Sequence, residues 1–95
     1  MQWMVMSLGN GRCWNGSFIR YLRLEDVLAA LHEGVNRTYG FAGVFFNYFM
    51  VSEAYADLMR HAIGKALSQS EVDDATAADL SALYEVYRGG KVIMG

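Results

Sequence analysis

The segment of residues 43–51, Gly-Val-Phe-Phe-Asn-Tyr-Phe-Met-Val, constrains the fold of this chain more than any other part of its sequence. Its β-branched and aromatic residues are those enriched in strands, and Gly43 and Ser52 flank it, so we predict a strand. Only Asn47 interrupts the apolar run, so both faces of this strand carry large apolar side chains. A helix continuous with the next segment is the alternative for these residues.

Two further strands are predicted near the N-terminus. Residues 2–8 are apolar at both alternating sets of positions, as expected for a strand that is covered on both faces. The sequence Gly9-Asn10-Gly11 tolerates positive φ, so we predict that the chain reverses there into a second strand over about residues 12–22.

Three later segments are predicted to form amphipathic helices. From Leu24 to Val35, apolar residues recur at spacings of three and four, with acidic residues in the first turn. Ser52 is the expected N-cap of a second helix that runs to about Leu67. Thr76 is the expected N-cap of a third helix.

The C-terminus allows two interpretations. Gly89-Gly90 can end the third helix and leave residues 91–94 as a terminal strand, which we favour, or it can turn a hairpin between residues 84–88 and 91–94. The predicted order is strand, strand, helix, strand, helix, helix, strand. This order indicates one α+β domain over residues 1–95, with a small, mainly antiparallel sheet of three or four strands packed against three helices.

Apolar composition gives the strongest indication of function. Hydrophobic residues make up 54% of the chain, above the roughly 45 to 50% of typical domains. A domain of this size buries only about 60 to 65% of its unfolded surface, so some large apolar side chains are expected to remain near the surface. The expected interface or ligand-binding residues are Phe45, Phe46, Tyr48, Phe49, Met50 and Trp14.

This surplus predicts a small, non-enzymatic protein-interaction module. We expect it to associate with itself as a homodimer, or with another protein, through an apolar surface rich in aromatic residues and methionine. The alternative is a domain that binds an apolar or cationic small molecule in a pocket lined by the aromatic strand.

One helical row offers a weak acid-base or metal-binding candidate. Glu53, Asp57 and His61 are spaced by four, which places two carboxylates and an imidazole on one side of the second predicted helix. The row lacks the second histidine of a helical zinc motif, and such spacing more often forms only a solvated face. We therefore expect no catalytic residues, no metal and no cofactor.

Charge and cysteine content bear on partners and location. The net charge is −2, and three arginines near the N-terminus are too few to argue for nucleic-acid binding. The longest apolar stretch, residues 41–51, is too short to cross a bilayer. Residues 1–6 lack the basic region of a signal peptide, and the single Cys13 cannot form an internal disulfide, so we expect a cytoplasmic protein without a membrane span.

Overall fold

The computed structural model describes residues 1–38 and 48–95. In order, its elements are β1 (Gln2–Ser7), β2 (Cys13–Ser17), α1 (Phe18–Leu31), β3 (Phe49–Met50), α2 (Glu53–Leu67), α3 (Asp74–Arg88) and β4 (Val92–Met94). This order confirms the predicted α+β class. It also confirms the terminal strand, because the chain after α3 pairs with β1 and β3 and does not fold back on the helix as a hairpin.

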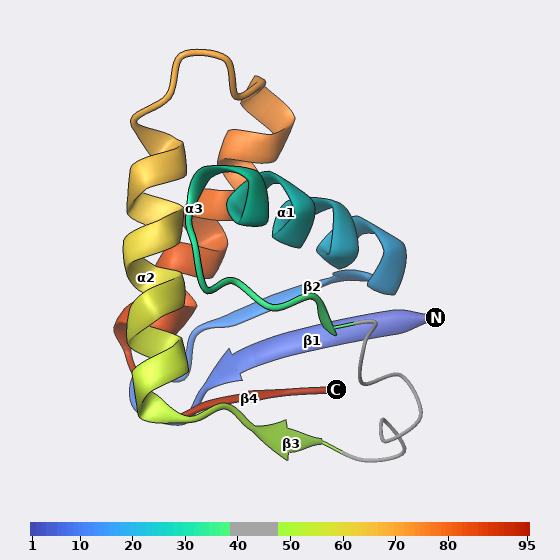
Figure 1. The fold of residues 1–95 in the computed structure, drawn as a ribbon. Helices are drawn as coiled ribbons and strands as arrows, with labels where there is room; N and C mark the ends of the chain where they lie inside the picture. Colours follow the sequence, from blue (N-terminus) through green and yellow to red (C-terminus); the bar gives the residue numbers. More distant parts are fainter. Residues whose placement is uncertain (39–47) are drawn as a thin grey trace.

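The sheet has the strand order β2-β1-β4-β3, and every pairing is antiparallel. The first and last strands therefore lie side by side, which ties the two ends of the chain together. Figure 1 shows α1, α2 and α3 on one side of this sheet. None of the described helices lies on the other side, so the described part of the chain forms two layers.

Alternation along the strands decides which side chains face the helices. In β1, Trp3 and Val5 are buried, whereas Met4 and Met6 on the opposite face are only half-buried and Leu8 beyond the strand is exposed. The prediction that residues 2–8 are covered on both faces is therefore wrong for the described structure. Its helices pack only against the face of Trp3 and Val5.

The second predicted strand is shorter than expected, and the first helix starts earlier. Ser17 caps α1 by accepting a hydrogen bond from the Arg20 N–H, so helix replaces the predicted strand from Phe18 onward. The buried stripe of α1 includes Tyr21, Leu24 and Leu28. The predicted start at Leu24 missed the first turns of this stripe.

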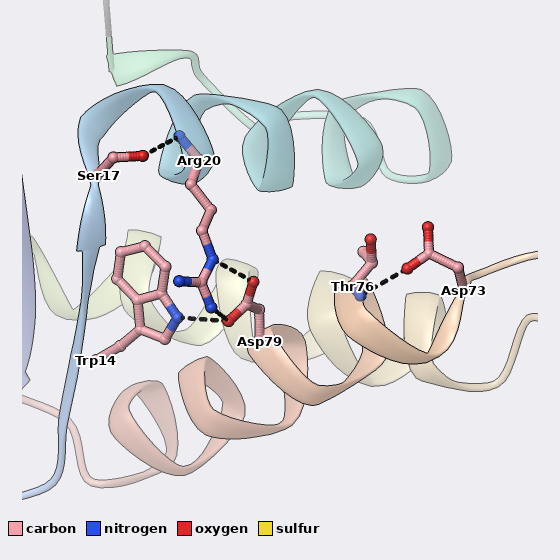
Figure 2. Close-up of polar contacts among 6 residues, drawn as sticks. All are labelled: Trp14, Ser17, Arg20, Asp73, Thr76 and Asp79. Carbon is pink, nitrogen blue, oxygen red and sulfur yellow. Dashed lines mark hydrogen bonds and ion pairs between the residues drawn. The ribbon is translucent and has the colours of Figure 1, made fainter.

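The N-caps of α2 and α3 fix where both helices begin. Ser52 caps α2 as predicted, because its hydroxyl accepts from the Tyr55 N–H. The predicted cap of α3 was wrong. Asp73 caps α3 instead, since its carboxylate accepts from the Thr76 N–H over 2.7 Å, as Figure 2 shows.

The turn between β1 and β2 is confirmed, and it is tied to the end of α3. The Ser7 hydroxyl donates to the Gly90 carbonyl over 2.6 Å, and the Asn10 amide donates to the Glu85 carbonyl over 2.8 Å. A Cβ at Gly9 would lie 2.0 Å from the Gly89 carbonyl oxygen. Glycine at position 9 therefore permits the close approach of the two backbones.

Opposite charges join α1 to α3. Figure 2 shows the Asp79 carboxylate receiving the guanidinium of Arg20 and the indole of Trp14. The Arg20 Nε donates to Asp79 over 2.7 Å, and the guanidinium lies 5.4 Å from the centre of the Trp14 ring. The arginine near the N-terminus and the acidic third helix thus attract one another within the chain.

Candidate functional site

The side of the sheet that faces away from the helices forms a continuous apolar row. The strand register pairs Cys13 with Met6, Met6 with Ile93, and Ile93 with Met50. These four side chains therefore cross the whole sheet from β2 to β3 on one face, because directly paired residues point to the same side.

A second, parallel row extends this surface. Asn15 pairs with Met4, and Met4 exchanges two backbone hydrogen bonds with Gly95. The Tyr48 ring lies against Gly95, since a Cβ on that glycine would approach a Tyr48 ring carbon to 2.6 Å. We call this surface the open face, and it consists of Met4, Met6, Cys13, Asn15, Tyr48, Met50 and Ile93.

The open face is accessible and uncharged. Tyr48 and Met50 are 63% and 59% exposed, and Met4, Met6 and Ile93 are half-buried. None of the residues of the four described strands is charged. Methionine side chains are flexible and polarizable, so such a surface can adapt its shape to a partner.

The structure separates the residues that the sequence grouped as an interface. Tyr48 and Met50 lie on the open face, whereas Phe49 points the other way, with its ring centre 6.4 Å from that of Trp3. Trp14 is only 3% exposed and belongs to the core, so it does not lie on the open face. Phe45 and Phe46 lie outside the described residues, as does most of the predicted strand over residues 43–51.

The row of Glu53, Asp57 and His61 is exposed on α2. Asp57 forms an ion pair with Arg60 at 2.6 Å, and its carboxylate lies 3.6 Å from the His61 ring nitrogen Nδ1. The hydrogen bond from Arg60 lowers the pKa of the Asp57 carboxyl. In residues 1–38 and 48–95, no group of three or more His, Cys, Asp or Glu side chains is arranged to hold a metal ion. Here the row is a solvated helix face whose charges pair locally.

The arginines and aromatic rings near the N-terminus do not form an exposed stacking surface. Trp14 and Tyr21 are buried, and their ring centres lie 5.6 Å apart. Arg20 is paired with Asp79. Bases of a single-stranded nucleic acid require accessible rings, which these two positions do not offer.

Sequence reasoning missed a buried carboxylate. Glu25, expected near the start of a helix, is only 2% exposed within α1. Its carboxylate accepts hydrogen bonds from the N–H of Thr38, over 2.8 Å, and from the Thr38 hydroxyl. Burial raises the pKa of the Glu25 carboxyl to about 7, although both hydrogen bonds from Thr38 oppose the rise. The spacing of Glu25 from Tyr21 and Leu28 places it on the buried stripe, and this signal could have found it.

No family model, curated protein or solved structure matches this chain. Each described helix also falls short of the length and apolarity needed to cross a membrane.

Proposed function

We propose that this chain is a protein-interaction module that self-associates through the open face of its sheet. The observation that carries the proposal is the two-layer arrangement, because the described helices cover one face and leave the other with half-buried and exposed apolar residues. An antiparallel sheet whose second face meets water normally carries polar side chains there. An apolar second face is typical of a surface that another molecule covers.

The absence of charge on the described strands favours a second copy of the same chain as the partner. In a two-fold dimer the same patch meets itself, so any charge on the patch would face a like charge or need a counter-ion nearby. One row of the open face passes through Met6 of β1 and the other through Met4. Besides the Tyr48 ring, both rows carry only apolar side chains, a thiol and an amide. Two open faces can therefore stack as in a β-sandwich, about 10 Å apart, without electrostatic cost.

The size of the open face sets the strength of this dimer. At a rise of about 3.3 Å per residue and a strand spacing of about 4.8 Å, the four short strands cover a flat area of about 250 to 300 Å². A standard interface buries about 800 Å² per partner. We therefore expect a weak, transient dimer.

An exposed free cysteine bears on where the module works. Cys13 is exposed at the β2 edge of the open face. A single accessible thiol is stable in a reducing compartment, which supports the proposal that the protein acts in the cytoplasm.

A pair of matched substitutions tests the proposed function. Met50 lies on the open face and is 59% exposed, and Ile19 lies on α1 and is 63% exposed. Because both side chains are accessible in the monomer, Met50→Glu and Ile19→Glu should leave the fold intact, which circular dichroism checks. Sedimentation velocity over a series of protein concentrations then measures self-association.

We expect the wild type and Ile19→Glu to dimerise with similar affinity, and Met50→Glu to remain monomeric at concentrations where the wild type is dimeric. A carboxylate at position 50 would face the uncharged surface of the partner and lose its hydration there. A monomeric wild type at about 1 mM, or equal dimerisation of both variants, would remove the proposal.

A further inference from the structure

A pocket that shares Met50 with the open face lies beside Glu25. It has a volume of about 320 Å³, and among the described residues it is lined by parts of α1, residues 36–38, β3, the start of α2 and β4. Its apolar walls include Phe49, Val51 and Met94. A pocket at the lower end of the usual size range, mainly apolar and with a few polar groups, is typical of a site for a small molecule.

Hydrogen bonds fix the carboxylate of Glu25 at the wall of this pocket. Thr38 donates its N–H to one carboxylate oxygen and its hydroxyl to the other. Each carboxylate oxygen has two lone pairs, so each retains one position that can accept from a ligand. The carboxylate is thus held in one orientation with acceptor capacity to spare.

Charge defines what this carboxylate would recognise. Glu25 is the charged side chain among the described residues that line the pocket. Arg37, whose positive charge also acts on Glu25, forms an ion pair with Asp26, which offsets that charge. A buried carboxylate is costly unless a cation or hydrogen-bond donors accompany it. The pocket therefore favours a ligand that brings a positive charge and disfavours an anion.

The aromatic side chains that line the pocket also suit an organic cation. The Tyr55 ring lines the pocket, and its hydroxyl is held by the backbone of Asn36, donating to the carbonyl over 3.0 Å and accepting from the N–H over 2.8 Å. Phe49 supplies a second ring. Aromatic faces attract ammonium groups, and their area buries the apolar part of a ligand.

We propose that this pocket binds a small aromatic or aliphatic amine, with the ammonium group on the Glu25 carboxylate and the apolar part against Phe49, Val51 and Tyr55. The site overlaps the open face only at the edge of the sheet, because Met6 and Ile93 of the open face do not line the pocket. Met50 lies at both sites and is therefore left unchanged in the tests below.

The protonation of Glu25 makes this binding depend on pH. The groups that act on it are Asp26 and Tyr21 on α1, Arg37 on the following segment, Tyr55 on α2 and Tyr87 on α3. The pKa values of all three tyrosines are raised, chiefly by burial, so their hydroxyls stay neutral below about pH 9. As the pH falls through about 7, Glu25 gains a proton and loses its attraction for an ammonium group.

The test uses 2-phenylethylamine as the probe, with 2-phenylethanol as a neutral ligand of similar shape and phenylacetate as an anionic one. Titrations followed by amide chemical shifts measure affinity and locate binding at Asn36, Thr38 and Ser52. At about pH 8 we expect one amine per chain, bound at least tenfold more tightly than the alcohol, and no binding of the anion. At about pH 5.5 the advantage of the amine should fall to threefold or less.

Glu25→Gln should abolish the higher affinity for the amine than for the alcohol. Glu33→Gln removes the same charge at an exposed position and should leave this difference in affinity intact. If Glu25→Gln does not fold, the pH dependence of amine binding to the wild type still tests whether the Glu25 carboxylate binds the ammonium group. Equal affinity for amine and alcohol at about pH 8, shifts confined to other residues, or no binding of the amine would overturn the proposal. The Met6→Glu variant should bind the amine as the wild type does. A failure of amine binding and a failure of dimerisation are therefore separate results.

Discussion

Replacing Glu25 with glutamine removes an ionisable group that is almost fully buried while keeping its shape. The amide oxygen can still accept from the Thr38 N–H, whereas the amide NH2 would donate to the Thr38 hydroxyl and so reverse that hydrogen bond. The pKa of this carboxyl is about 7 in the folded protein, against an ordinary value of 4.5. Between these values the folded state holds a proton that the unfolded chain has released. Stability from this group is therefore present at low pH and is lost as the pH rises through about 7.

The size of this effect follows from the two pKa values. Each pKa unit corresponds to about 1.4 kcal/mol, so Glu25 lowers the free energy of unfolding by about 3 kcal/mol at high pH relative to acid. Most of this change, about 2 to 3 kcal/mol, falls between pH 5 and pH 8. Domains are stable by only about 5 to 15 kcal/mol, so the loss is easily measured.

Urea unfolding followed by the fluorescence of the buried Trp3 and Trp14 gives the free energy of unfolding at each pH. The protein concentration must be fixed and low, because dimerisation also stabilises the folded state. We expect the difference in the free energy of unfolding between Glu25→Gln and the wild type to grow by about 2 to 3 kcal/mol in favour of the variant from pH 5 to pH 8. The exposed control Glu33→Gln should show no such growth. A constant difference across this range would refute the reasoning.

Two further substitutions test the contacts that join the helices. Asp79→Asn should lower the free energy of unfolding in urea by about 1 kcal/mol, because it weakens a partly buried ion pair to Arg20 beside the Trp14 indole. A change near zero at every pH would contradict this role of Asp79. Asp73→Ala should lower the free energy of unfolding measurably because Asp73 caps α3, whereas Thr76→Ala should lower it less; the reverse order would show that Thr76 is the cap.

Periodic segments of the sequence predicted the fold well. The helix capped by Ser52 and the terminal strand were found because apolar spacing and local cap residues point to the same boundaries. The start of α1 was missed because β-branched and aromatic residues around Phe18 favour a strand locally. The cap at Ser17 and the packing of Tyr21 outweighed that preference.

The candidate sites were harder to predict because they depend on contacts between distant segments. The row through Met6 and Ile93 exists only because β1 pairs with β4, which lies at the other end of the chain. The pKa of Glu25 is raised because the folded chain buries its carboxyl, and a hydrogen bond from Thr38, which lies on another segment, holds the carboxylate in place. Trp14 was assigned to a surface because composition shows that some aromatic residues remain exposed but does not show which ones.

Direct contact between two open faces is the central claim, and intermolecular nuclear Overhauser effects measure it. A sample mixes chains carrying ¹³C-labelled methionine and isoleucine methyl groups with unlabelled chains, at about 1 mM. We predict contacts from the methyl groups of Met4, Met6 and Ile93 to the Tyr48 ring or the methionines of the other copy. Contacts that involve only Ile19 on α1, or no intermolecular contacts at this concentration, would contradict the account.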